Sequence, residues 1–157
     1  PDRRAITRNA KRKKGRRRSY IKGTIINDEH EQYTLALGMM HAMRVAIGRR
    51  IAPGERTALV LDDFMSVDKY VLPPGGMNHG PLPTPPHNLS HTFKFKDYSP
   101  MVFREIRRIC GLEDSSYMLS VCGNRNFIEF IPNSKSGQFF FYSHDGKYMI
   151  KTQTPEE

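Results

Sequence analysis

The sequence predicts an α+β fold in which an antiparallel β-sheet has helices packed on one side. Three patterns among the 157 residues indicate this class. Apolar residues recur at helical spacing after Asn27 and again after Ser99, which predicts two helices with one buried face each. Runs of aromatic and β-branched residues lie around these helices, and the last two runs flank Asp145-Gly146, a pair typical of tight β-hairpin turns. The length suits one domain with a modest core.

The formal net charge of +9 is concentrated at the amino-terminal end. Residues 1–22 contain eleven lysines and arginines and a single acid, whereas residues 23–157 contain fourteen basic and fifteen acidic residues. Because residues 1–22 are almost devoid of apolar side chains, they are predicted to form a disordered basic tail and not a secretory signal. No apolar run reaches the roughly 18 residues that a transmembrane helix needs. Cys110 and Cys122 fit no metal-binding spacing and suggest buried thiols in a reducing, intracellular compartment.

The tail clusters Lys11–Lys14 and Arg16–Arg18 allow several interpretations. They could attract anionic lipid headgroups, act as a nuclear localisation signal, bind nucleic acid, or serve only as a solvated arm. Nucleic acid is the least favoured partner, because a base-reading domain is expected to spread its basic residues over the folded surface. A lipid surface ranks first and nuclear import second.

The first half of the folded region is predicted to contain a helix and two strands. The helix spans 28–48, where Asp28 and Glu31 resemble a capping box and a methionine-rich stripe suggests core packing. Leu59–Leu61 and Phe64–Leu72 are predicted strands, the second apolar on both faces as in a strand buried on both sides. The segment 73–92 is rich in proline and glycine and is predicted to be a long loop. Its three histidines make a metal site a minority hypothesis, since their spacing fits no common motif.

The second half is predicted to begin with a strand at Phe93–Lys96, whose residues alternate. Ser99 and Pro100 then suggest an N-cap and a first helical residue. The outer face of this helix carries three arginines, which could be solvated or could face a membrane. A shorter helix at 112–122 and a strand at Phe127–Ile131 follow.

The stretch Asn133–Thr152 carries the candidate chemistry. A small polar loop precedes Phe139–Tyr142, and a second strand ends at Lys151, which alternation places on the same face as Met149. Backbone N–H groups of a small-residue loop and a nearby lysine can together bind phosphate. The pattern contains no established nucleotide-binding motif, so an ordinary surface hairpin remains an alternative on these residues alone.

From Phe93 to Thr152 the chain resembles the amino-terminal part of a phosphatidylinositol phosphate kinase catalytic domain, of the phosphatidylinositol-4-phosphate 5-kinase type. The matching residues stand in the family's order and spacing over about sixty residues: Phe93–Tyr98, Pro100–Arg104, Tyr117–Ser120, Lys135–Gly137, Phe139–Phe140, Asp145 and Met149–Thr152. The resemblance extends more loosely back to Gly23. It implies that residues 23–157 form the small, nucleotide-covering lobe of a lipid kinase.

The resemblance also implies roles for individual residues. Lys151 would contact the phosphates of ATP, and the loop of Ser134, Lys135, Ser136, Gly137 and Gln138 would lie over them. The chain departs from the family at Ser134, usually glycine, and at Gln138, usually serine. These changes stiffen the loop and enlarge one of its side chains.

The family's catalytic aspartate, its ligands for Mg²⁺ and its lipid-selecting segment lie beyond the matched residues. The fragment is therefore expected to contain no catalytic or metal-binding residue and to be inactive, while its parent is the kinase that converts a phosphatidylinositol monophosphate to the bisphosphate. The alternative is a non-catalytic scaffold or membrane tether. The expected partners are ATP, an anionic phosphoinositide membrane surface and a second copy of the chain. The expected location is cytoplasmic, at the inner face of the plasma membrane, with the nucleus as the alternative.

Overall fold

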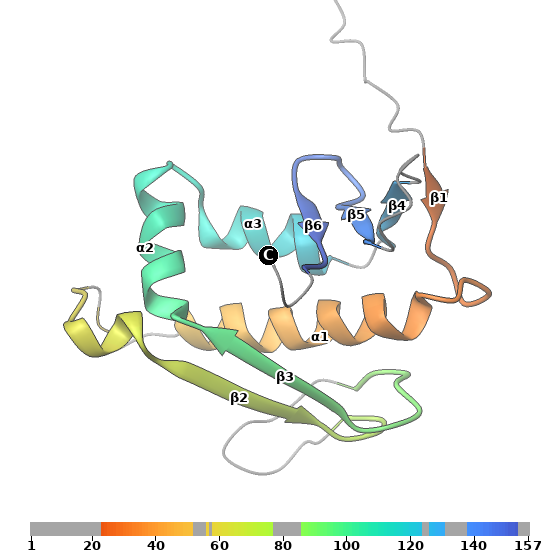
Figure 1. Ribbon diagram of the computed structural model, residues 1–157, viewed down its shortest axis with the longest axis horizontal. Helices are drawn as coiled ribbons and strands as arrows, with labels where there is room; N and C mark the ends of the chain where they lie inside the picture. The colour runs from red at the N-terminus through yellow and green to blue at the C-terminus, as the bar shows by residue number, and fades with distance from the viewer. Residues whose placement is uncertain are drawn as a thin grey trace, which may run out of the picture.

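A computed structural model describes residues 23–51, 56, 58–76, 86–123, 126–130 and 138–153 (Figure 1). The predicted basic tail, residues 77–85 of the predicted loop and residues 131–137 lie outside this description. The elements, in chain order, are β1 (Thr24–Ile25), α1 (Tyr33–Arg50), the 3-10 helix η1 (Leu61–Phe64), β2 (Val67–Leu72), β3 (Phe93–Tyr98), α2 (Pro100–Ile109), α3 (Asp114–Cys122), β4 (Ile128–Phe130), β5 (Phe140–Tyr142) and β6 (Met149–Lys151).

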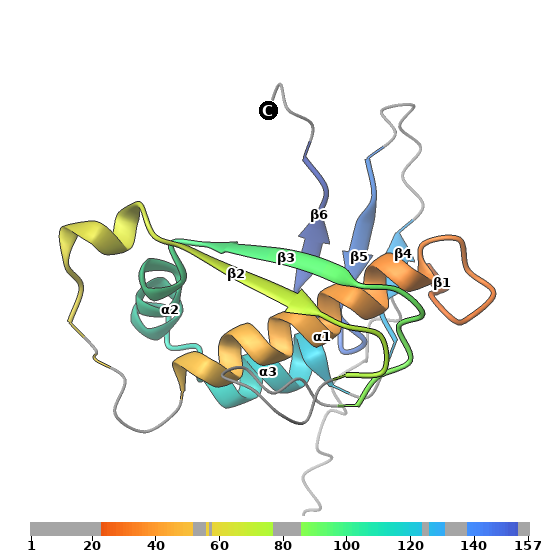
Figure 2. The same cartoon turned by 90° about the horizontal axis from the view of Figure 1, so that it is seen from below.

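The strands form two antiparallel sheets, so the predicted α+β class is confirmed. One sheet has the order β1-β4-β5-β6, and the other is the β2–β3 pair. Helix α1 lies between β2–β3 on one side and α3 with the larger sheet on the other (Figures 1 and 2). The sequence predicted a single sheet. The strands are divided because α1 has apolar residues on several faces, and one sheet can cover only one of them.

The described residues form three core clusters, and α1 contributes to each. Ala42 and Ala46 pack against β2 and β3, Ala36 packs against the larger sheet, and Ile47 packs against α3. The methionines of α1 also face the core, as the sequence predicted. A helix surrounded by other elements must present small or apolar residues in most directions, which explains the alanines.

Helix α1 begins at Tyr33, five residues later than predicted. The capping box expected at Asp28 and Glu31 is absent, because residues 28–32 form turns and the N-cap, Gln32, makes no side-chain cap. His30 instead fixes the segment that leads into α1. Its Nδ1 accepts the Gln32 N–H at 3.1 Å, so Nε2 carries the proton that it shares with Glu129 of β4 at 2.9 Å.

The segment before β2 is not the strand that was predicted at Leu59–Leu61. The carboxylate of Asp63 accepts the Val60 N–H at 2.8 Å and binds Arg56, which turns residues 61–64 into a 3-10 helix. Strand β2 begins at Val67 and has one buried face, with Tyr70 and Leu72 against α1. The prediction that both of its faces are buried is wrong, since the β2–β3 pair packs on α1 by one side only.

Helix α2 begins with Pro100 at its first position, as predicted, but Ser99 is not a side-chain cap. Ser99 has a φ of +49°, and its hydroxyl donates to the Phe64 carbonyl oxygen at 2.8 Å. The serine therefore joins η1 to the start of α2. Helix α3 and strand β4 lie within the predicted segments 112–122 and Phe127–Ile131, and both begin one or two residues later than predicted.

Helix α1 closely approaches strand β3 at Gly38. A Cβ atom at this position would lie 2.4 Å from the ring of Phe93 in β3, which is too close for any side chain. Gly38→Ala is therefore expected to lower the free energy of unfolding by about 1–3 kcal/mol, even though alanine favours helices. Gly48 in the same helix has nothing within 4 Å of such an atom, so Gly48→Ala should raise stability by about 0.5–1 kcal/mol. Urea denaturation of both variants tests this, and equal effects would contradict the packing argument.

Candidate phosphate-binding hairpin

Strands β5 and β6 form an antiparallel hairpin in which Phe140 lies opposite Lys151 and Tyr142 opposite Met149. Phe141 is fully buried, and Ile150 packs beside it toward α1. Lys151 and Met149 are exposed on the other face, as strand alternation predicted. The hairpin thus carries the candidate lysine on a face that the core does not use.

Two hydrogen bonds close the end of the hairpin that bears Lys151. The N–H of Phe139 donates to Thr152 Oγ1 at 2.9 Å, and the N–H of Thr152 donates to the Phe139 carbonyl oxygen at 3.1 Å. Gln138, a half-buried residue, directly precedes this closure. Of the predicted phosphate loop, Ser134, Lys135, Ser136 and Gly137 lie outside the described residues. Their role stays a prediction, but the chain re-enters the sheet at the end where Lys151 lies.

Aromatic stacking gives the hairpin a rigid base. The ring of Phe141 stacks on Phe139 at 6.3 Å with an interplanar angle of 5°, and on Phe127 at 6.5 Å with an angle of 29°. Phe127 is itself buried beside Ile26 and Ala36. Such offset ring pairs stabilise beyond their buried area, and they fix the strand that leads out of the candidate loop.

The turn at the opposite end differs from the two-residue turn that was predicted. The N–H of Ser143 donates to the Tyr148 carbonyl oxygen at 2.9 Å, so four residues, 144–147, form the loop. Gly146 takes the positive φ of +69°, and Asp145 serves as an acceptor instead. Its Oδ1 accepts the hydroxyls of Ser120 at 2.6 Å and Ser143 at 2.8 Å.

Asp145 fastens the hairpin to α3, a role that the sequence did not reveal. Burial alone would raise the pKa of Asp145, but hydrogen bonds from Ser120, Ser143 and Lys147 hold this pKa well below its usual range. The only local signal was a serine two residues before an acid in a turn. The partner on α3, Ser120, is 25 residues away and could not be inferred.

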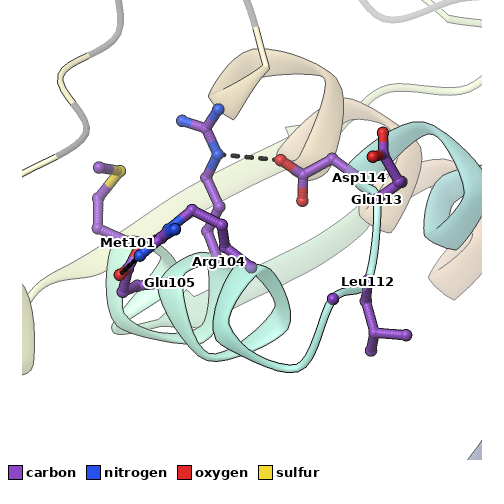
Figure 3. A pocket seen from close by; sticks show the side chains of 8 residues that line it. Met101, Arg104, Glu105, Leu112, Glu113 and Asp114 are labelled. Carbon is purple, nitrogen blue, oxygen red and sulfur yellow. Dashed lines mark hydrogen bonds and ion pairs between the residues drawn. The ribbon is translucent and has the colours of Figure 1, made fainter.

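The arginines of α2 are largely engaged in ion pairs, so the structure gives little support to a membrane-facing patch there. Arg104 and Arg107 both bind Asp114 of α3, and Arg108 binds Glu105. A cavity of about 290 Å³ is lined by Arg104, Glu105, Arg108 and Asp114 together with neighbouring residues of α2 and of the segment between α2 and α3 (Figure 3). Its arginines are balanced by carboxylates, including Glu113, and it lies away from the β5–β6 hairpin (Figure 1). This cavity is therefore a poor phosphate site.

The histidines of the 73–92 segment do not gather in the described structure. His87 is buried against His41 of α1 with ring centroids 5.0 Å apart, whereas His91 is exposed and His79 lies outside the described residues. Burial, His87 and Arg44 lower the pKa of His41 to about 4. No group of three potential metal-binding side chains occurs within the part of the chain that the structure describes.

Comparison with known proteins supports the resemblance carried by the sequence. Residues 121–157, which include the hairpin, match the family model for phosphatidylinositol-4-phosphate 5-kinase. Phosphatidylinositol 4-phosphate 5-kinase 4 of Arabidopsis thaliana is 38% identical over 137 residues, 86% of this chain. Phosphatidylinositol 4-phosphate 5-kinase 9 of the same plant is 36% identical over 155 residues, 96% of this chain. The chain belongs to the phosphatidylinositol-4-phosphate 5-kinase family.

The relationship extends to fungi and covers a small part of each relative. Phosphatidylinositol 4-phosphate 5-kinase its3 of Schizosaccharomyces pombe is 33% identical over 130 residues, 83% of this chain. The chain spans 17–18% of the length of these phosphatidylinositol-4-phosphate 5-kinases. Among the residues that the structure describes, no helix combines the length and apolar character of a bilayer-spanning segment.

Replacement of Asp145 should loosen the hairpin. Asp145→Ala leaves the buried hydroxyls of Ser120 and Ser143 without their acceptor, so the free energy of unfolding should fall by about 1–3 kcal/mol. Lys147→Ala, the control, removes only an exposed ion pair and should cost less than about 0.5 kcal/mol.

The effect of Asp145→Ala should also depend on pH. The pKa of Asp145 is lower in the folded chain than in the unfolded chain, where it is about 4. The carboxylate therefore contributes fully to the free energy of unfolding above pH 4, and this contribution is lost as the pH falls below 4. Denaturation at pH 7 and pH 3 measures this difference. If Asp145→Ala lowers the free energy of unfolding by the same amount at pH 7 and at pH 3, the proposed role of the carboxylate is contradicted.

Proposed function

We propose that this chain supplies the ATP-binding part of a kinase that phosphorylates phosphatidylinositol 4-phosphate to the bisphosphate. The observation that carries the proposal is the position of Lys151. It is exposed at the hairpin end where the chain leaves the candidate phosphate loop, inside the segment that matches the family model. The names of the relatives support the substrate, and the family supports the use of ATP.

The chemistry expected of these residues is electrostatic. Phosphoryl transfer spreads negative charge over the transferred group, and a lysine held by a rigid strand stabilises that charge without reorganising. The side chains of Phe139, Phe141 and Thr152 supply the rigidity. The residues 134–138 would add backbone N–H donors over the phosphates.

Magnesium, which the family implies as a cofactor, does not fit the described residues. Among the described residues, the acid nearest in sequence to Lys151 is Asp145, which lies at the other end of the hairpin and already binds Ser120, Ser143 and Lys147. Ligands for the ion would have to come from outside the described residues, so we assign the metal none of these residues. The catalytic base, an aspartate in the family, is likewise expected outside the matched residues.

Lys151→Met in the complete kinase should lower kcat/KM for ATP by about 100-fold or more, because the transferring phosphoryl group loses a positive charge. Lys147→Met is the matched control, since Lys147 lies at the opposite end of the same hairpin. Its activity should stay near that of the unmodified kinase. The measurement is transfer of labelled phosphate from ATP to phosphatidylinositol 4-phosphate in vesicles. Equal losses in the two variants, or none in Lys151→Met, would argue against the assigned role.

We further propose that the outer face of β2–β3 meets an anionic membrane at the inner side of the plasma membrane. This lysine face consists of three lysines and three apolar or aromatic residues, all exposed: Val67, Lys69, Val71, Lys94, Lys96 and Tyr98. The acids of the same strands, Asp68 and Asp97, alternate to the other side, where Arg50 binds Asp68.

The register of the lysine face argues for a partner. Lys69 lies directly opposite Lys96, an arrangement that is unfavourable in an isolated sheet. An anionic surface relieves this repulsion, and each lysine near it adds about 1 kcal/mol of attraction. Folded residues therefore supply basic groups to the membrane in addition to the tail.

The double variant Lys69→Glu, Lys96→Glu should bind vesicles that contain phosphatidylserine or phosphatidylinositol 4-phosphate about tenfold more weakly, or worse. Lys147→Glu should bind normally, because that lysine lies outside the β2–β3 face. Sedimentation with vesicles measures the binding. A chain that starts at Gly23 should retain part of the affinity. If removal of residues 1–22 abolishes binding completely, the tail is the tether and the lysine face has no such role.

A further inference from the structure

Large apolar side chains are gathered on the outside of the turn that precedes β2. Leu61 is 87% exposed, Met65 85% and Phe64 54%. Val67 and Tyr98, which lie opposite each other at the adjoining end of β2–β3, are also exposed. We call these five residues the apolar tip. Helix η1 projects at one end of the molecule, beyond the end of the β2–β3 pair (Figures 1 and 2).

The apolar tip is held by polar groups that turn inward. Asp63 is 3% exposed, and its carboxylate binds Arg56 and the Val60 N–H. The hydroxyl of Ser66 donates to the Asp63 carbonyl oxygen at 3.0 Å, and that of Ser99 to the Phe64 carbonyl oxygen at 2.8 Å. A surface turn normally exposes its acids and buries its apolar residues. Here the arrangement is reversed at Asp63, so the exposure of Leu61, Phe64 and Met65 is enforced by hydrogen bonds.

The apolar tip is continuous with the lysine face. Val67 and Tyr98 belong to both, and Lys69 and Lys96 form the next outward pair along the strands. A projecting cluster of leucine, phenylalanine and methionine beside basic residues is the composition of segments that enter the headgroup region of anionic membranes. Asp62 is the exposed acid of the same turn, and it is outnumbered by the three lysines.

We propose that the apolar tip inserts into the headgroup layer of an anionic bilayer while the lysine face lies on its surface. The inference rests on the membrane association proposed above and adds a second, salt-resistant contact to it. Charge alone would hold the protein loosely and allow it to rotate. Insertion at one end of β2–β3 fixes the orientation of the lobe, and with it the direction in which Lys151 faces.

The absence of tryptophan from the sequence allows a direct test. A tryptophan introduced by Met65→Trp should shift its emission to shorter wavelength when the 157-residue chain binds phosphatidylserine vesicles. Lipids brominated near the top of the acyl chain should quench it. The matched control is Leu119→Trp, because Leu119 is 69% exposed but lies on α3, on the other side of α1 (Figure 1). That emission should not change. The proposal is overturned if the protein binds the vesicles but the tryptophan at position 65 keeps the emission of a water-exposed indole.

A binding experiment separates the apolar tip from the lysine face. Leu61→Ser with Met65→Ser should leave the free energy of unfolding nearly unchanged, since both side chains are exposed. Vesicle binding by this variant should fall about tenfold at high salt, where lysine attraction is screened, and less at low salt. If the Lys69→Glu, Lys96→Glu variant loses binding but the Leu61→Ser, Met65→Ser variant binds as the unmodified chain does, the lysine face contacts the membrane and the apolar tip does not insert. If the unmodified chain binds no vesicle at all, both proposals fail.

Discussion

The fold depends on the burial of α1 from two sides. Small residues at Ala36, Gly38, Ala42 and Ala46 let neighbouring elements approach its backbone closely, and the ring of Phe93 occupies the space that a side chain at Gly38 would need. These small residues allow α1 to pack against both the two-stranded and the four-stranded sheet. The β2–β3 pair would be marginal without it, because an isolated hairpin rarely buries enough apolar surface to be stable. The position of both sheets therefore follows from one helix.

A chain of contacts transmits the position of α1 to the candidate site. Arg44 of α1 donates from Nε to the Cys122 carbonyl oxygen at 3.0 Å, which anchors the end of α3. Ser120 of α3 donates to Asp145, and Asp145 holds the turn of the β5–β6 hairpin. Lys151 lies at the far end of that hairpin, where the Phe139–Thr152 hydrogen bonds close it. Each link is a buried or half-buried polar contact, so a lysine on an exposed strand has a defined place in the fold.

Local patterns predicted the features that depend on neighbours in sequence. The positions of the helices, the pairing of β5 with β6 and the shared face of Lys151 and Met149 follow from local sequence patterns, although the turn at Asp145-Gly146 has four residues and not the predicted two. The failures concern specific side-chain hydrogen bonds and ion pairs, which strand and helix propensities do not encode. Leu59–Leu61 has strand propensity, but the ion pair of Asp63 with Arg56 and its hydrogen bond from Val60 override it. The phosphate-loop assignment rests on family resemblance, since Ser134–Gly137 lie outside the described residues.

The arginines of α2 and the exposed lysines of β2–β3 differ in their surroundings among the described residues. The arginines of α2 bind acids of the same helix or of α3, where their planar guanidinium groups suit paired contacts. The exposed lysines of β2–β3 lie instead on a face that carries no acid, with Lys69 directly opposite Lys96. If these lysines served only solubility, mixed charges would do so without the repulsion. A net charge near zero in residues 23–157 is therefore consistent with a one-sided electrostatic surface.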